Sequence, residues 1–349
     1  MPEISGGGAK LNGLLRKTAT TSRHQDRRLS ELRCTRQRRI AVIGQAAFGA
    51  DVLKGLIERG QQVVGVFCPP DRGSKVDPIK DAAQAAGIPV FQPSHMRNPE
   101  AYEAMVSLAP DLGVLAFVTD IVPPKLFNVP KLGSIEYHPS LLPKYRGSSA
   151  INWAVINGET QTGLSIFWLD EGIDTGDILI QKKVEIGPNE TTGEVYFNKL
   201  YPLGVQALLE AVDLVAQGKA PRIVQDHSQS TYDPPCDEKV APLNWHQPGR
   251  KVFDFIRGCD PQPGATTTFK GEQVKLYNAS YLMADHVAQP GEILEVSDKG
   301  IKVAVSGAAL FITRFRTKDL GKVKAPDFIA AKKPHAGDRF GAPAVMRCC

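Results

Sequence analysis

One stretch of the chain contains both a strand pattern and a loop with reactive side chains. Residues 133–147 read Gly-Ser-Ile-Glu-Tyr-His-Pro-Ser-Leu-Leu-Pro-Lys-Tyr-Arg-Gly. The apolar run 133–138 predicts a strand that ends directly before Pro139. In α/β folds, the carboxyl end of a strand is where side chains reach a ligand. His138, the last residue of this run, is therefore a candidate functional residue.

A second stretch supplies a partner for this histidine. Residues 171–177 read Glu-Gly-Ile-Asp-Thr-Gly-Asp, after a strand-like run at 163–169. Asp174 is thus predicted to lie in a glycine-bracketed turn at the end of its own strand. Two strand ends can meet at one edge of a sheet, where a carboxylate orients an imidazole and favours its charged form. The sequence predicts that His138 and Asp174 form an acid–base pair.

The chain around this stretch alternates between strands and helices. Buried apolar runs predict strands, and runs with helical spacing predict helices. The expected strands are 39–44, 62–68, 89–91, 112–116 and 133–138, and the expected helices are 48–59, 78–86, 101–108 and 191–217. This alternation predicts an α/β fold with a doubly wound, mostly parallel sheet.

The remainder of the chain has a different pattern. A polar segment at 226–242 contains Pro234 and Pro235 and predicts a linker. A helix at 252–259 and short β runs follow and predict a small β-barrel. The β runs are 265–269, 274–279, 292–296, 301–305 and 309–316. The expected organisation is a tail at 1–38, a catalytic domain at 39–225, the linker, a barrel domain at 243–330 and a tail at 331–349.

Composition excludes several classes of protein. The six cysteines have no CxxC spacing, so they predict neither a zinc site nor a disulfide framework, and a reducing compartment is expected. No apolar run approaches the ~18–20 residues that span a bilayer, so no membrane association is expected.

The net charge of +5 comes from the two ends of the chain. Residues 1–39 hold ten Lys or Arg and three Asp or Glu (net +7), and residues 332–349 hold four and one (net +3), which leaves −5 for the body. An acidic body disfavours broad electrostatic capture of nucleic acid. The Arg-rich segment 1–38 is either an organellar presequence or a disordered extension. The expected location is the cytoplasm, or the mitochondrial matrix if this segment is a presequence.

The turn at 44–49, Gly-Gln-Ala-Ala-Phe-Gly, resembles a dinucleotide fingerprint only superficially. Ala46 occupies the position of the second glycine, and the second strand ends at Cys68 rather than at an acid for the ribose. A tight strand-to-helix turn is therefore expected, and no NAD(P) cofactor.

Three motifs resemble the 10-formyltetrahydrofolate-dependent formyltransferases. They are His138, the loop Ser-Leu-Leu-Pro-Lys-Tyr-Arg-Gly at 140–147 and the turn Asp-Thr-Gly-Asp at 174–177. Tyr137 and Pro139 beside the histidine, with 149–153 and 165–168, resemble the hydrolase domain of 10-formyltetrahydrofolate dehydrogenase. Methionyl-tRNA formyltransferase is the next similar branch. Trp245, Ile256-Arg257 and 261–265 resemble the C-terminal β-barrel of the family.

The resemblance implies removal of the formyl group of 10-formyltetrahydrofolate, by hydrolysis to tetrahydrofolate and formate or by transfer to an acceptor. His138 would stabilise the oxyanion and protonate the leaving nitrogen, and Asp174 would take up the proton of the nucleophile. No metal is required. Three alternatives remain open: methionyl-tRNA formylation, formylation of a small amine, and folate binding without catalysis. The short, nearly neutral segment 70–78 disfavours tRNA, because the tRNA enzymes carry a basic insertion there.

The resemblance also implies a pterin pocket near 116–123. The residues expected to contact folate are Phe117, Asp120, Ile121, Val122, Leu141, Arg146, Leu169 and Asp170. Arg146 would face the glutamate tail of folate or form an ion bridge to a local carboxylate, and the bridge is favoured.

Glu136 departs from the pattern. The transferases carry Asn at this position, on the strand face that also carries the histidine, whereas the hydrolase domain has an apolar residue. A carboxylate cannot donate a hydrogen bond unless it is protonated. Glu136 is therefore expected either to face solvent or pair with Lys or Arg, or to act as a third catalytic residue that favours the charged form of His138 or holds a water.

Overall fold

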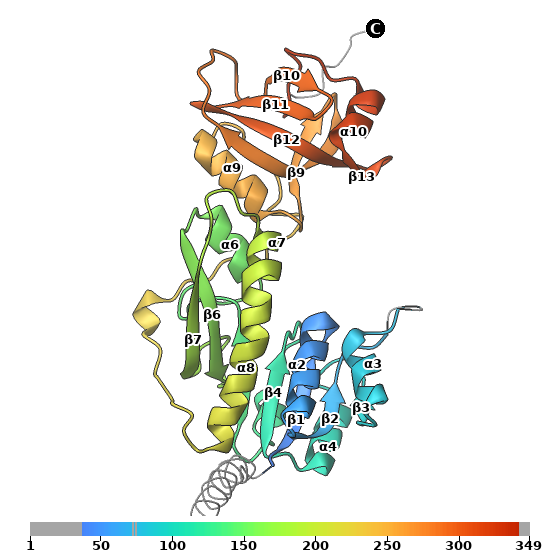
Figure 1. Cartoon of the computed structure of the whole chain (residues 1–349), viewed down its shortest axis with the longest axis vertical. Coiled ribbons are helices and arrows are strands. Elements are labelled where there is room, and N and C mark those ends of the chain that lie inside the picture. Colours follow the sequence, from blue (N-terminus) through green and yellow to red (C-terminus); the bar gives the residue numbers. More distant parts are fainter. Residues whose placement is uncertain (1–36, 72, 74, 342–349) are drawn as a thin grey trace, which may run out of the picture.

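The structure is a computed structural model that describes residues 37–71, 73 and 75–341. One seven-stranded sheet has the order β3-β2-β1-β4-β5-β6-β7 (Figure 1). Its strands are β1 (Arg39–Gly44), β2 (Gln62–Phe67), β3 (Val90–Phe91), β4 (Leu112–Ala116), β5 (Ser134–His138), β6 (Gln161–Trp168) and β7 (Ile178–Glu185). The first five are parallel, and β6 and β7 are antiparallel. The strand order reverses between β1 and β4, where doubly wound sheets open a crevice at the carboxyl ends.

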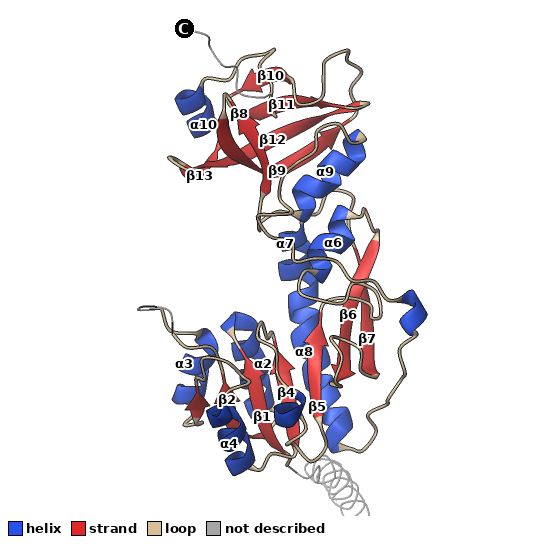
Figure 2. Cartoon of the chain, turned by 180° about the vertical axis from the view of Figure 1, so that it is seen from behind, coloured by secondary structure: helices blue, strands red, loops and turns tan. Residues whose placement is uncertain are grey.

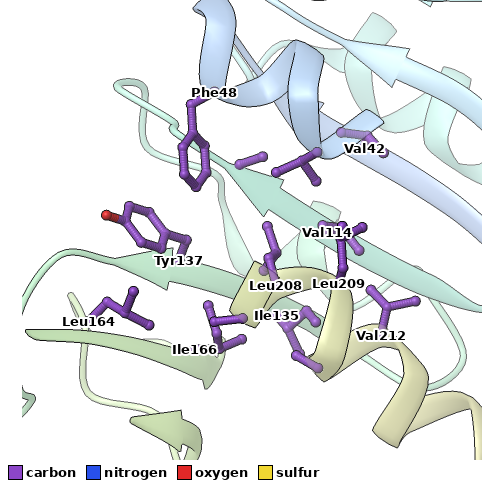
Figure 3. Close-up of a cluster of buried hydrophobic side chains, with 14 of the residues drawn as sticks. Val42, Phe48, Val114, Ile135, Tyr137, Leu164, Ile166, Leu208, Leu209 and Val212 are labelled. Carbon is purple, nitrogen blue, oxygen red and sulfur yellow. The ribbon is translucent and has the colours of Figure 1, made fainter. Parts of the chain in front are cut away.

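Helices cover both faces of this sheet. On one face, α2 (Ala46–Glu58) and α8 (Tyr201–Ala216) pack on Val42, Val114 and Ile135 (Figure 3). On the other, α4 (Pro99–Leu108) and α5 (Pro124–Phe127) pack on a second cluster. Because strand side chains alternate between faces, Ile135 and Tyr137 point to the first cluster. Glu136 and His138 then point to the opposite face.

The prediction of an α/β fold with a mostly parallel sheet is confirmed, with differences in particular elements. The expected single helix at 191–217 is α7 (Thr192–Val195), a π-helical turn η1 (Tyr196–Leu200) and α8. Pro202 lacks an N–H and its ring crowds the carbonyl one turn earlier, which explains the irregular turn. The sequence interpretation omitted α6 (Ala150–Ile156) and β7. Lys182 and Lys183 weaken the apolar alternation of β7, which is the edge strand.

The C-terminal domain is a six-stranded antiparallel sheet, as Figure 2 shows. Its strands are β8 (Ala265–Phe269), β9 (Glu272–Leu282), β10 (Ile293–Ser297), β11 (Gly300–Val305), β12 (Ala308–Thr317) and β13 (Gly321–Lys324). This sheet shares one core with α9 (Gly249–Gly258) and α10 (Ala325–Lys332). The separate β domain that the sequence predicted is therefore present. It stands at one end of the elongated molecule, where α9 contacts α6 (Figure 1).

The expected C-terminal tail is in part folded. The Phe340 side chain is fully buried in the core of the C-terminal domain, and Arg339 pairs with Glu292 as an isolated β-bridge. The segment expected to be a tail outside the folded domain therefore packs on that domain over its described part. One aromatic residue in a polar stretch gave no periodic signal from which this packing could be predicted. The proposed presequence at 1–38 lies almost entirely outside the described residues.

Candidate active site

The His138 side chain is held between two acceptors. Its Nε2 lies 2.7 Å from the Tyr145 carbonyl oxygen, and its Nδ1 lies 3.6 Å from Asp174 Oδ2. Both side chains are largely buried, with 7% and 12% of their surfaces exposed. Because a carbonyl oxygen only accepts, Nε2 carries a hydrogen, and Nδ1 is the nitrogen that can exchange a proton with Asp174. The structure thus brings together the two side chains that the sequence paired.

The Asp174 turn is held in place by the backbone. Asp174 has a left-handed conformation, with φ +55°, which Asp adopts more readily than most residues. Its Oδ2 accepts a 2.7 Å hydrogen bond from the Gly147 N–H. At Gly176, a Cβ would lie 1.7 Å from the Trp168 carbonyl oxygen, so only glycine fits there. The glycine that follows the aspartate therefore permits this turn.

The loop after β5 is fixed by hydrogen bonds to serines. The Ser140 hydroxyl donates to the Lys144 carbonyl at 2.7 Å, and the Ser165 hydroxyl of β6 donates to the Ser140 carbonyl at 2.7 Å. The Leu142 N–H donates to Ser165 Oγ at 3.1 Å. Tyr145 then has φ +56°, and its carbonyl oxygen accepts from His138. The loop thus fixes the orientation of the imidazole ring.

Arg146 connects the loop to a distant segment of the chain. Its guanidinium donates to Gln225 Oε1 at 2.7 Å and to the Tyr232 hydroxyl at 2.9 Å, and it lies 3.0 Å from His227 Nδ1. Gln225 in turn donates to the Asp174 carbonyl at 2.9 Å. The favoured ion bridge is not formed, since no carboxylate among the described residues lies within ion-pair distance of Arg146. The sequence analysis did not identify Gln225, His227 or Tyr232 as partners of Arg146. His227 and Tyr232 lie in the segment that was predicted to be a linker.

Glu136 is neither exposed nor paired. It is partly buried, and no described Lys or Arg forms an ion pair with it. The expectation that Glu136 faces solvent or pairs with Lys or Arg is therefore wrong. Burial, followed by the nearby charge of Asp174, raises the pKa of Glu136 from 4.5 to about 8. This shift favours the protonated form of the carboxyl group at neutral pH.

The residues after β4 have mixed environments. Phe117 is 39% exposed with φ +63°, and Ile121 is 76% exposed, so both present apolar surface. Val122 is buried in the core, which leaves its backbone for any ligand contact. The Asp120 carboxylate accepts from the Met96 N–H at 2.7 Å. These side chains lie at the carboxyl end of β4, next to the end of β5 that carries His138.

The other three residues expected to contact folate serve local packing. Leu169 packs against the α4 and α5 cluster, and its N–H donates to the Ser134 carbonyl at 2.9 Å. Leu141 lies against Gly163, where a Cβ would meet its methyl carbon at 2.5 Å. Asp170 accepts from the Gly172 N–H and the Thr175 hydroxyl within its own turn. Their expected contacts with folate stay predictions.

A small pocket lies at the point where the strand order reverses. It is lined by Ile43, Gly44, Gln45, Phe67, Cys68, Pro69, Pro70, Pro93, Ser94, Met96, Phe117, Val118, Thr119 and Asp120. Burial raises the pKa of the Cys68 thiol to about 12, so this thiol stays protonated and is a poor nucleophile. The Asp77 carboxylate accepts from the Ala46 N–H at 2.8 Å at the start of α2. A carboxylate therefore occupies the helix terminus that would hold a pyrophosphate in a dinucleotide site.

The described residues contain no group of three or more His, Cys, Asp or Glu placed to hold a metal ion. In the same part of the chain, no helix is both long and apolar enough to cross a bilayer.

Two family models and several known proteins match this chain. The formyl transferase model matches residues 38–212, and the model of the formyl transferase C-terminal domain matches 237–333. Cytosolic 10-formyltetrahydrofolate dehydrogenase of Xenopus tropicalis is 43% identical over 74% of this chain and 29% of its own length. The chain thus spans less than a third of that relative. Methionyl-tRNA formyltransferase of Geobacter sulfurreducens is 37% identical over 87% of this chain and 96% of its own length.

Solved structures show the same fold. HypX from Aquifex aeolicus in complex with tetrahydrofolic acid has a TM-score of 0.65 at 20% identity, over 86% of this chain and 48% of that one. An N-formyltransferase from Helicobacter canadensis, in complex with folinic acid and dTDP-3-aminofucose, has a TM-score of 0.64 at 17% identity, over 79% and 99%. With both domains matched, in the order that the structure shows, this chain belongs to the formyl transferase family.

Proposed function

We propose that this protein removes the formyl group from 10-formyltetrahydrofolate, passing it to water or to an acceptor amine. The observation that carries the proposal is the buried His138–Asp174 pair, with Nδ1 and Oδ2 3.6 Å apart. The name of one relative, 10-formyltetrahydrofolate dehydrogenase, supports the choice of donor. The exposed Phe117 and Ile121 supply apolar surface in the segment after β4, the strand next to β5, and a flat pterin ring requires such a surface.

The reaction divides into two steps when water is the acceptor. Asp174 takes a proton from water as the oxygen attacks the formyl carbon, which gives a tetrahedral oxyanion. The C–N10 bond then breaks, the carbonyl forms again, and protonated His138 donates its Nδ1 proton to the leaving nitrogen. The products are tetrahydrofolate and formic acid, which loses its proton to solvent and becomes formate, and the proton on Asp174 then passes to Nδ1 and restores the charged His138. The fixed Tyr145 contact leaves only one nitrogen free for this transfer.

Steady-state release of tetrahydrofolate by the purified chain tests the proposal. The assay uses 10-formyltetrahydrofolate with water alone and with a set of amines that includes amino sugars. We expect tetrahydrofolate to form with at least one of these acceptors. If folate binds tightly but no acceptor supports turnover, the chain is a folate-binding module and the proposal is wrong.

A second candidate function is formylation of methionyl-tRNA. It is favoured by one observation, the match to methionyl-tRNA formyltransferase over 96% of that protein's length. An assay with 10-formyltetrahydrofolate as donor and aminoacylated initiator tRNA as acceptor distinguishes tRNA formylation from hydrolysis. Formylated methionine at a rate well above the rate of hydrolysis would establish the tRNA reaction.

A further inference from the structure

Glu136 lies in an apolar part of the strand that carries His138. Its direct neighbours across the sheet are Leu115 of β4 and Phe167 of β6. Residues directly opposite on adjacent strands project on the same face, and these two side chains are 1% and 2% exposed. The carboxyl group is therefore flanked by hydrocarbon on both sides, which disfavours its charged form.

No Lys or Arg among the described residues offsets this burial. The titratable groups that face Glu136 are His138, two residues along the same face of β5, and Asp174, from the turn after β6. Within the described ranges, the carboxyl of Glu136 has no hydrogen bond or ion pair with a basic side chain. A second negative charge beside Asp174 would be repelled, so the pKa of Glu136 lies well above its ordinary value, at about 8.

We infer that Glu136 is a catalytic residue that works as a neutral carboxylic acid, donating its O–H hydrogen bond to the formyl oxygen as that oxygen becomes an oxyanion. This inference rests on the proposed function. It identifies the oxyanion donor of the same site. Glu136 keeps its proton throughout, so no bond to hydrogen is broken, and His138 still supplies the proton to the leaving nitrogen.

The protonation state decides whether Glu136 helps or hinders the reaction. A neutral carboxyl offers one donor, whereas a carboxylate offers none and repels a developing negative charge. A neutral acid that is buried beside the formyl oxygen can stabilise the negative charge that develops there, because few water molecules compete for the hydrogen bond. Glu136 therefore assists below its pKa and opposes the reaction above it.

Two variants separate the donor from the charge. Glu136→Gln keeps an N–H donor of similar shape and cannot ionise, and Glu136→Met removes the donor but keeps the length. At pH 7 we expect Glu136→Gln to have turnover within about threefold of the wild type, and Glu136→Met to lose about 10²-fold. At pH 9, one unit above the pKa, the wild type should fall about tenfold relative to Glu136→Gln, since only about a tenth of the acid is still protonated. Folate binding, measured alongside, should be unchanged in both variants.

Either of two kinetic results would overturn the inference. One is an alkaline limb that is the same in the wild type and in Glu136→Gln, and the other is full activity in Glu136→Met. Infrared spectroscopy tests the protonation state apart from turnover: a protonated carboxyl band should be present at pH 7, disappear towards pH 9, and be absent from Glu136→Gln. If the wild type turns over no formyl donor, the proposed function fails on its own assay. Absence of the infrared band would instead refute the neutral acid directly.

Discussion

The two ring nitrogens of His138 have different roles, because the loop after β5 forms a hydrogen bond with one of them. Nε2 is held by the Tyr145 carbonyl at 2.7 Å, so only Nδ1 can exchange a proton with Asp174. Asp174 is held in turn by the Gly147 N–H. The two side chains therefore act on one proton path, as a unit.

Substitution of the pair tests this unity. His138→Ala and Asp174→Asn should each lower turnover by at least about 10²-fold, with folate affinity within a few-fold. Asn is the matched change, because it accepts the Gly147 hydrogen bond, tolerates the left-handed backbone and removes only the charge. The double variant should be far from additive. Additive losses in the kinetic measurement would mean that the residues act independently.

The raised pKa of Glu136 also predicts how stability depends on pH. The folded chain keeps this proton up to about pH 8, whereas the unfolded chain releases it near 4.5. Between these values the unfolded state binds fewer protons, so the free energy of unfolding falls as pH rises through that window. Urea midpoints of the wild type, compared with those of Glu136→Gln from pH 5 to pH 8, measure this. The wild type should lose stability relative to the variant, and a constant difference would argue against the shift.

At the scale of elements, sequence separation decided what could be predicted. The parallel strands could be predicted because buried apolar runs and the helices between them have strong local sequence patterns. His138 and Asp174 could be predicted as site residues because each follows or ends such a run. The partners of Arg146 were not, since Gln225 and Tyr232 lie 79 and 86 residues away in the chain. Neither the strand pattern nor the composition indicates that a polar, proline-containing segment returns to the site.

The approach of α8 to β5 depends on Gly204. A Cβ at this position would lie 2.5 Å from Tyr137 Cε2 and 3.1 Å from Phe48 Cε2. Alanine has a higher helix propensity than glycine, but the steric overlap should dominate, because these two rings are buried and in contact, with ring centroids 4.6 Å apart. Gly204→Ala should therefore lower the free energy of unfolding by about 1–3 kcal/mol. Gln206→Ala, on the exposed side of α8, is the control, and equal stability of the two variants would contradict the packing.

At the scale of the molecule, a buried arginine of α9 connects the two domains. Arg257 of α9 donates to Asp254 at 2.7 Å and to the Glu190 carbonyl of the catalytic domain at 2.8 Å. Both charged side chains are nearly fully buried. Arg257→Met would leave Asp254 with only the more exposed Arg250 as its partner and would remove the hydrogen bond to Glu190, so it should cost about 2–3 kcal/mol. Chemical denaturation measures this, with the more exposed Arg250→Met as the control, for which about 1 kcal/mol or less is expected. Similar losses in the two variants would show that burial of the Arg257 contacts adds no stability.

The central claim is that the His138–Asp174 pair removes the formyl group of a folate donor. The most direct measurement is a single-turnover experiment with excess enzyme, in which wild type and Asp174→Asn are each mixed with 10-formyltetrahydrofolate and the acceptor that the steady-state assay identifies. The account predicts tetrahydrofolate from the wild type and at least about 10²-fold slower release from Asp174→Asn, at equal folate binding. Equal rates in the two proteins, or tight folate binding by the wild type without any release of tetrahydrofolate, would contradict it.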